Sequence, residues 1–229
     1  MLTLAIDTAT KICTVALLQD QKILGEYSIN AGMTHSEGLL PQIEQLLQRA
    51  GRQKNELELL AVSMGPGSFT GLRIGLATAE AVAYSRQCFL HGVNTLKALA
   101  WNLPVDGLLL SPVLDAQKGN YYQSLYRWDK GVLSEIMPVR VVSGAVLYEE
   151  LARRGERVAL LGECDRLEQN RLPLNVFAAP HTLRMPRASS VGLAALDEFS
   201  AAEDRKIFGL EPYYIRRSEA EELWEKQQN

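Results

Sequence analysis

The amino-acid sequence predicts an α/β fold of two lobes, in which each lobe is a mixed β-sheet flanked by helices. Three observations support this prediction. Short apolar runs typical of strands alternate with longer stretches of helical period. A strand that ends in an aspartate occurs twice, at Asp7 and at Asp115, and each is followed by further strands and then a helix. A glycine-rich turn at residues 65–71 joins a strand to a helix, which is a common arrangement in α/β proteins.

The length and composition are those of an ordinary globular protein. The chain has 229 residues, 47% of them hydrophobic and 22% charged, enough for one large domain or two small ones. The formal net charge of −3 provides no overall basic field for holding nucleic acid. No apolar stretch approaches the length of a membrane span, and the N-terminus lacks the basic region of an export signal. We therefore expect a cytoplasmic protein that makes no membrane contact.

The first part of the chain predicts three adjacent strands and a helix. The strands cover residues 2–6, 12–18 and 23–29, and their short links favour an antiparallel meander. Residues 35–50 then show the period of an amphipathic helix, with leucines and an isoleucine on one face. Gly51 is a typical helix stop.

The central stretch predicts a buried strand, a turn and a helix. Residues 59–64 form the apolar run of a buried parallel strand, and residues 72–84 form a helix that is apolar on more than one side. The turn between them does not match a Walker A loop, because Gly71 is followed by Leu72 and Arg73.

Two interpretations of this glycine turn remain open. Its backbone N–H groups, together with Arg73, are suited to binding an anion. Alternatively, Gly65, Gly67 and Gly71 make a tight turn and allow close packing, which is the interpretation that we favour. Gly71, Gly75, Ala79 and Ala83 are spaced four apart and form one ridge of small residues on the helix.

The two helices of this lobe are predicted to form a partner interface, because the sheet can bury only part of their apolar surface. We expect a bulky charged residue at Ala79 to prevent pairing and to leave the monomer folded. The predicted interface residues are Leu39, Leu40, Ile43, Leu46, Leu72, Gly75, Leu76, Ala79 and Ala83.

A turn-rich hinge near residue 104 predicts the boundary between the lobes, so that residues 1–104 form the first and residues 105–229 the second. A strand at 89–93 and a short helix at 95–101 complete the first lobe. In the second lobe we expect strands at 108–114, 121–128, 132–142 and 157–161, and helices at 143–154 and 190–202.

Four motifs resemble one family. They are residues 7–10, 65–75, 115–122 and 212–216, and they look like the TsaB (YeaZ) family of bacterial tRNA threonylcarbamoyladenosine synthesis. The resemblance is strong from Met1 to about Tyr126 and weaker through the second lobe. It implies membership of the actin-like ATPase superfamily, with an RNase H-like topology (βββαβα) in each lobe, in agreement with the duplicated pattern of strands.

The resemblance implies a scaffold function. Members of the family are similar to their partner TsaD, which carries the catalysis, and they work with the ATPase TsaE. The complex transfers threonylcarbamoyl from threonylcarbamoyl-AMP to N6 of the adenosine adjacent to the anticodon in tRNA. The resemblance also implies that the helix pair meets its equivalent on TsaD in a four-helix bundle, and that the same surface can form a homodimer when the chain is alone.

The resemblance also implies a nucleotide site of which this sequence keeps a remnant. Asp7 with Thr8, and Asp115 with Gly119, match the two regions that hold metal and ATP in actin-like ATPases. Ala9 replaces the glycine that lets a phosphate reach the backbone. We therefore expect no cofactor, and we expect the aspartates to cap turns at strand ends.

Two other functions remain as alternatives. The first is an active actin-like ATPase or kinase, and the second, more remote, is a peptidase. Ser68 does not stand at the middle position of a Gly-x-Ser-x-Gly nucleophile motif. The histidines His35, His91 and His181 form no helical pair, so we expect neither a zinc protease nor any metal site.

Overall fold

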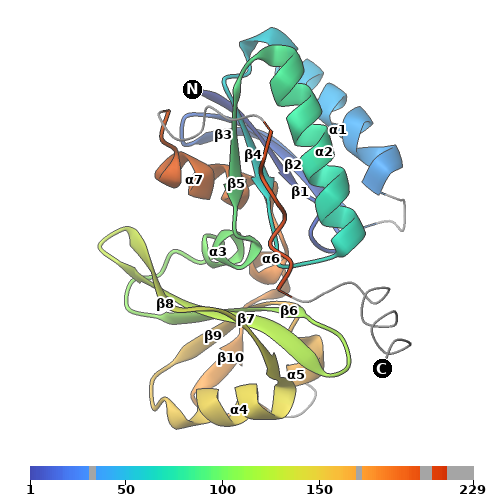
Figure 1. Ribbon diagram of the computed structural model, residues 1–229. Coiled ribbons are helices and arrows are strands. Elements are labelled where there is room, and N and C mark those ends of the chain that lie inside the picture. The colour runs from blue at the N-terminus through green and yellow to red at the C-terminus, as the bar shows by residue number, and fades with distance from the viewer. Residues whose placement is uncertain (31–34, 169–171, 202–207, 216–229) are drawn as a thin grey trace, which may run out of the picture.

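The structure is a computed structural model that describes residues 1–30, 35–168, 172–201 and 208–215. It contains two lobes, one above the other in Figure 1, and each is built on a five-stranded sheet. The predicted two-lobed α/β fold is therefore confirmed.

The first sheet has the strand order β3-β2-β1-β4-β5. Strands β1, β2 and β3 form the predicted antiparallel meander, and β4 and β5 extend the sheet in parallel on the other side of β1. The five strands are β1 (Leu2–Asp7), β2 (Cys13–Gln19), β3 (Lys22–Ile29), β4 (Leu59–Ser63) and β5 (Phe89–Val93).

The second sheet repeats this arrangement, with the strand order β10-β9-β6-β7-β8. Strands β6, β7 and β8 are antiparallel neighbours, and β9 and β10 extend the sheet in parallel on the other side of β6. The strands are β6 (Leu109–Asp115), β7 (Asn120–Asp129), β8 (Val132–Ser143), β9 (Val158–Gly162) and β10 (Val176–Ala178). The two lobes thus share one topology, as the repeated strand-to-aspartate pattern predicted.

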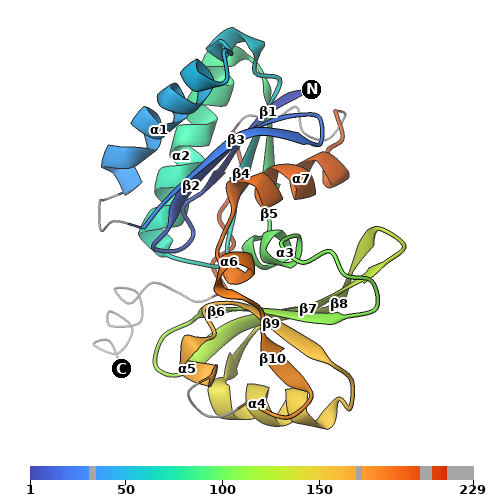
Figure 2. The ribbon, with the colours of Figure 1, turned by 180° about the vertical axis from the view of Figure 1, so that it is seen from behind.

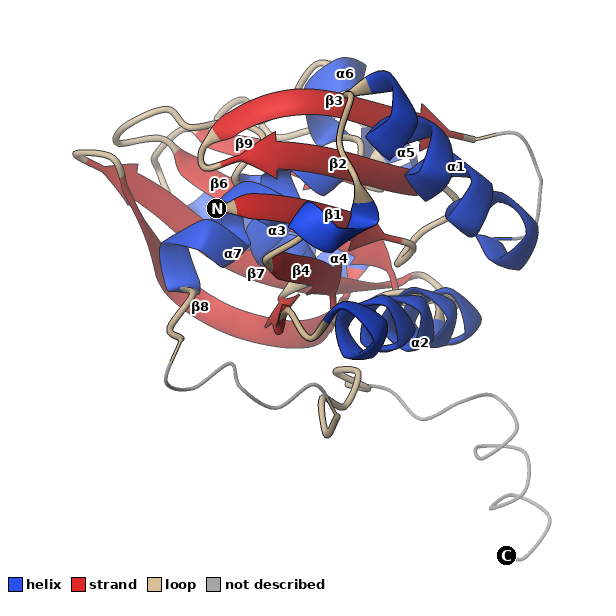
Figure 3. Ribbon diagram, turned by 90° about the horizontal axis from the view of Figure 1, so that it is seen from above, coloured by secondary structure: helices blue, strands red, loops and turns tan. Residues whose placement is uncertain are grey.

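Helices α1 (His35–Arg49) and α2 (Phe69–Arg86) lie side by side on one face of the first sheet, as Figures 1 and 3 show. One core joins these helices to β1, β2 and β4, and its buried leucines and isoleucine from the helices are Leu39, Ile43, Leu46, Leu47 and Leu76. In the second lobe, α4 (Gly144–Arg153) covers the sheet face that is turned away from the first lobe, near α5 (Asp165–Glu168) (Figure 2).

Three helices connect the lobes or cross between them. The helix α3 (Thr95–Ala100) lies between the sheets, where Leu99 packs in the second-lobe core and Ala98 packs against the first sheet. The chain then returns from the second lobe through α6 (His181–Arg184) to α7 (Ala188–Glu198). The helix α7 packs on the face of the first sheet opposite α1 and α2 (Figure 3).

The position of α7 qualifies the proposed domain division at residue 104. Ala188, Val191 and Ala195 are buried against β1 and β2, so this part of the second segment covers the first lobe. The reason is physical: a sheet with two apolar faces needs a layer on each, and α1 and α2 cover one face only. The division between residues 1–104 and 105–229 remains a proposal for the rest of the chain.

Several element boundaries differ from the predicted ones. The helix α2 begins three residues earlier than predicted, because the side chain of Ser68 caps it by accepting a hydrogen bond from the N–H of Gly71. The short elements α5, α6 and β10, and the 3₁₀ turn at Lys54–Glu56, were not predicted. Among the described residues, no helix is both long and apolar enough to cross a membrane.

Candidate functional site

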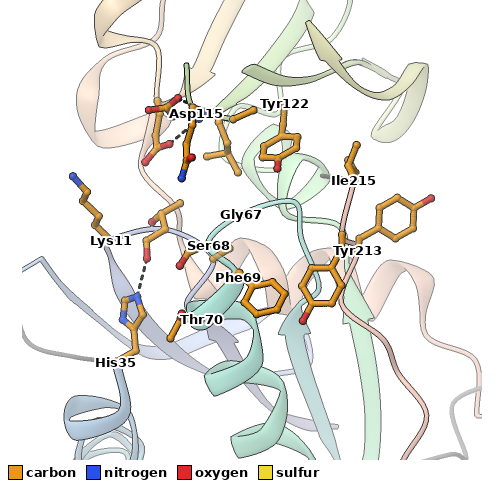
Figure 4. A pocket seen from close by; sticks show the side chains of 17 residues that line it. Lys11, His35, Gly67, Ser68, Phe69, Thr70, Asp115, Tyr122, Tyr213 and Ile215 are labelled. Carbon is orange, nitrogen blue, oxygen red and sulfur yellow. Dashed lines mark hydrogen bonds between the residues drawn. The ribbon is translucent and has the colours of Figure 1, made fainter. Parts of the chain in front are cut away.

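A cavity of about 580 Å³ lies between the two lobes and brings distant parts of the sequence together (Figure 4). Its walls come from the turn after β1, the start of α2, the turn after β6 and the segment near residue 214. The lining residues are Ala9, Thr10, Lys11, His35, Gly67, Ser68, Phe69, Thr70, Leu114, Asp115, Ala116, Gln117, Tyr122, Glu163, Tyr213, Tyr214 and Ile215.

The glycine turn packs closely against the turn that follows β1. A Cβ atom on Gly67 would overlap the carbonyl oxygen of Ala9, and one on Gly71 would overlap the carbonyl oxygen of Thr8. The N–H of Ser68 donates to the Ala9 carbonyl at 2.6 Å. Gly65 has a φ of +110°, which favours glycine. These contacts support the packing interpretation of the glycines.

Arg73 does not contribute to this cavity. Its Nε donates to the hydroxyl of Tyr214 at 3.0 Å, and its guanidinium carbon lies 3.9 Å from the centre of the Phe69 ring. This contact is a cation–π interaction. The side chain therefore holds two aromatic residues at the cavity wall, which is a role that sequence reasoning did not foresee.

Asp7 and Thr8, the first half of the predicted nucleotide remnant, are buried beneath the cavity and do not line it. The Asp7 carboxylate accepts hydrogen bonds from Ser63 Oγ at 2.7 Å and from the N–H of Ala9 at 2.8 Å. Burial raises the pKa of Asp7 above its usual value. Thr8 Oγ1 donates to the carbonyl oxygen of Gly71 at 2.7 Å. Both side chains thus serve the local structure of the turn.

The two residues of the second half of the predicted remnant, Asp115 and Gly119, differ in whether they line the cavity. Asp115 lines the cavity and caps its own turn, because its Oδ1 accepts the N–H of Gln117 at 2.8 Å. Gly119, with a φ of +78°, belongs to the same turn but does not line the cavity. Of the four predicted remnant residues, only Asp115 reaches the cavity. The turn-capping interpretation therefore accounts for both aspartates.

Glu163 is a cavity residue that the sequence did not single out for this role. Its Oε2 accepts the backbone N–H of Asp115 at 2.9 Å. Burial raises the pKa of Glu163 above its usual value, and the nearby charge of Asp115 adds to this effect. The charge of Lys11, a cavity residue from the other lobe, lowers the same pKa. The charged end of the cavity therefore carries groups of both signs.

The other end of the cavity is aromatic and apolar. Phe69 and Tyr214, whose rings lie 4.9 Å apart centre to centre, line it on one side, and Tyr122 lines it from the other lobe (Figure 4). On the polar side, His35 Nε2 lies 2.8 Å from the carbonyl oxygen of Thr10, so the ring is held by the turn after β1. Within the described ranges, no three His, Cys, Asp or Glu side chains gather where they could hold a metal ion.

The predicted partner interface needs a correction. Most of its side chains are buried in the core of the first lobe, and Leu40 is the exception, with 53% of its surface exposed. The ridge on α2 faces the chain's own first lobe, because Gly71 and Gly75 lie against Thr8 and because Ala79 and Ala83 belong to the first-lobe core. The buried members are Leu39, Ile43, Leu46, Leu72, Gly75, Leu76, Ala79 and Ala83.

The outer face of α2 consists of different residues. Arg73, Ala77, Ala81 and Tyr84 are exposed and recur at helical spacing. The sequence does not single out Ala77, Ala81 and Tyr84, because α2 is apolar on more than one side and its periodicity does not show which side faces the sheet.

Comparison with protein families and curated proteins gives matches over most of the chain. The family model described as "TsaD: tRNA N6-adenosine threonylcarbamoyltransferase" matches residues 29–224. A Bacillus subtilis protein described as tRNA threonylcarbamoyladenosine biosynthesis protein TsaB is 33% identical, over 98% of this chain and 98% of its own. The Escherichia coli protein of the same description is 27% identical, over 97% of this chain and 96% of its own.

Comparison with solved structures gives the same fold. A Pseudomonas aeruginosa protein described as similar to the peptidase YeaZ has a TM-score of 0.76 at 23% identity, covering 94% of this chain and 99% of that one. The ethanolamine utilization protein EutJ from Carboxydothermus hydrogenoformans has a TM-score of 0.53 at 12% identity, covering 85% of this chain and 90% of that one. At these identities the structures show the shared fold alone.

Proposed function

The chain belongs to the TsaB (YeaZ) family of tRNA threonylcarbamoyladenosine biosynthesis, and on that premise we propose that it is a non-catalytic scaffold subunit. Its partner is a TsaD-type protein, and TsaE joins the pair. The complex transfers threonylcarbamoyl from threonylcarbamoyl-AMP to N6 of the adenosine adjacent to the anticodon. tRNA is bound through the complex, and the chain works in the cytoplasm, where tRNA is modified.

The observation that carries this proposal is the outer face of α2. The small side chains of Ala77 and Ala81 form an uncharged strip along the exposed side of the helix, and Tyr84 lies at one end of it. Small side chains let a second helix approach closely, and exposed aromatic residues are enriched at protein interfaces. The parallel helix α1 adds the exposed Leu40 (Figure 1). A helix pair of the related fold fits this surface, and so does a second copy of the chain.

The positions and hydrogen bonds of Asp7 and Asp115 support the proposal that the chain is not catalytic. Asp7 is buried and its carboxylate accepts two internal hydrogen bonds, while Asp115 caps a turn. An ATPase of this superfamily would need both carboxylates at the cavity to hold its metal and water. The alternative ATPase function is tested by calorimetry and turnover with Mg-ATP, for which we expect neither binding nor hydrolysis by the chain alone.

The pairing proposal is tested with the double variant Ala77→Arg/Ala81→Arg. Both positions are exposed, so we expect an unchanged melting temperature and loss of the heterodimer with the TsaD-type protein of the same organism. Size-exclusion chromatography with light scattering measures the complex, and sedimentation of the chain alone measures the homodimer. Ala145→Arg on the exposed face of α4 is the control and should still pair. A heterodimer of undiminished affinity with the double variant would refute the proposed surface.

A further inference from the structure

The segment 208–215 runs from the first lobe to the second and contacts both. In Figure 1 it is the red segment that passes between β5 and α2 and descends toward β6. At its start, the Phe208 ring packs on Tyr84 of α2 with ring centres 5.4 Å apart. Two residues later, Leu210 packs against the first-lobe core, and Ile215 at the other end packs against the second-lobe core.

The middle of the segment is attached to the glycine turn. The N–H of Tyr213 donates to the carbonyl oxygen of Met64 at 2.6 Å, directly before Gly65. A Cβ on Gly65 would lie 2.9 Å from the Tyr213 carbonyl oxygen, so glycine is needed there for this approach. The glycine turn thus packs against the β1 turn on one side and against this segment on the other.

Tyr214 adds a side-chain attachment at the cavity. Its ring lies 4.9 Å from that of Phe69, centre to centre, and its hydroxyl accepts the hydrogen bond from Arg73. Tyr213, Tyr214 and Ile215 form one side wall of the cavity, opposite Lys11 and His35 in Figure 4.

A second connection between the lobes lies at α3 and α6. The Asn102 amide donates to the carbonyl oxygens of Leu183 and Met185 at 2.9 and 2.7 Å, and its oxygen accepts from Ser190 at 2.6 Å. These bonds are buried or partly buried, as expected of a permanent joint. The segment 208–215 is different, because its Phe208, Tyr213 and Tyr214 side chains are 58%, 62% and 41% exposed.

We propose that residues 208–215 are a releasable strap that holds the two lobes together across the cavity, with the α3–α6 connection as the hinge. Partly exposed rings and a short extended backbone give low local stability, so the strap opens without unfolding either sheet. Release removes one wall of the cavity and lets the lobes separate about the hinge. The strap therefore controls access to the space between Lys11 and Tyr122.

The first test measures the distance between the lobes in the full chain. Spin labels on Gln45→Cys of α1 and Ala145→Cys of α4 report this distance by double electron–electron resonance, since both positions are exposed and the native cysteines are buried. The strap variant Tyr214→Ala/Ile215→Ala should show a second, longer distance population. A distribution identical to that of the unmodified strap would overturn the proposal.

A control variant separates release of the strap from general loss of apolar surface. Val132→Ala/Ile136→Ala removes two exposed apolar side chains of β8, away from the strap, and should leave the distance distribution unchanged. If the control broadens the distribution as much as the strap variant does, the strap has no special role and the proposal fails.

The second test does not depend on how well the strap variant folds. Hydrogen exchange followed by mass spectrometry compares residues 208–215 with strand β4 in the unmodified chain. We expect the strap amides to exchange at least roughly tenfold faster than those of β4, and faster again in the mild variant Phe208→Ala. Equal protection of the strap and β4 would show that the segment is a fixed part of the core and would contradict its release.

Discussion

The hydroxyl of Thr8 donates a hydrogen bond to the carbonyl oxygen of Gly71 at 2.7 Å, and this bond joins the turn after β1 to the first turn of α2. The Gly71 Cα lies so close to the Thr8 carbonyl that a Cβ would overlap it. The glycine at position 71 therefore allows the turn after β1 and the first turn of α2 to come into contact.

Gly71→Ala is expected to destabilise the fold. The added methyl group meets backbone rather than a flexible side chain, so the helix must move away from β1. Overpacking costs roughly 1–3 kcal/mol, and a Cβ only 2.0 Å from a backbone oxygen belongs at the upper end of that range, above the gain of about 1 kcal/mol in helix propensity. Urea unfolding should show a net loss. Ala77→Ser on the exposed face of α2 is the control and should change stability by less than about 0.5 kcal/mol.

Ala79→Glu is expected to unfold or severely destabilise the monomer. From the sequence alone, the monomer is instead expected to stay folded and to lose only its pairing. Ala79 has no exposed surface and belongs to the first-lobe core. A carboxylate placed there without a partner should cost roughly 3 kcal/mol or more. Circular dichroism melting measures this. If the variant melts like the unmodified chain, the position of the ridge in this structure is wrong.

Asp7→Asn is expected to change how stability depends on pH. Burial raises the pKa of Asp7 in the folded chain, so the folded state binds this proton more tightly than the unfolded state does. The stabilising contribution is present below the usual carboxyl pKa of about 4 and is lost as the pH rises through the raised value.

Asparagine has no such titration and can keep both hydrogen bonds, with the N–H of Ala9 and with Ser63. The stability of Asp7→Asn relative to the unmodified chain should therefore increase between pH 4 and pH 7. Urea unfolding at a series of pH values measures the difference. A difference that stays constant or decreases with pH would contradict the assigned environment of Asp7.

Glu26→Ala is expected to loosen α7 from the first sheet. Glu26 Oε1 accepts the backbone N–H and the hydroxyl of Ser189, both at 2.9 Å, and Oε2 accepts from Arg187 at 2.8 Å. Loss of a partly buried charged acceptor should cost roughly 1–3 kcal/mol. Hydrogen exchange should show faster exchange over the first turn of α7. Glu149→Ala, which removes an exposed ion pair with Arg153, should cost less than about 1 kcal/mol.

The sequence predicted the strands and long helices well because their signal is local. The β1–β3 meander and α1 follow from apolar periodicity and short polar links. The start of α2 was missed because Gly71 stands in its first turn, where glycine usually indicates a loop. The elements α5, α6 and β10 were missed because each spans only three or four residues, too few to show a period.

The site was predicted only in part. The family resemblance assigned Asp115 to a nucleotide-site remnant, and Asp115 does line the cavity. Asp7 ends the equivalent strand yet turns into the core, where Ser63 and the N–H of Ala9 bind its carboxylate. Nothing in the sequence indicates that Lys11 and Glu163 line the same cavity, since they come from different lobes.

The sequence by itself determined the kind and order of the longer elements, the repeated topology and the family, because these depend on local periodicity and on contiguous motifs. Only the tertiary structure decided which side of α2 is buried, where α7 packs and which residues line the cavity. These features depend on contacts between segments far apart in the chain, such as those of Gly65 with Tyr213. Such contacts form when the sheets are covered on both faces, and no short window of sequence contains both partners.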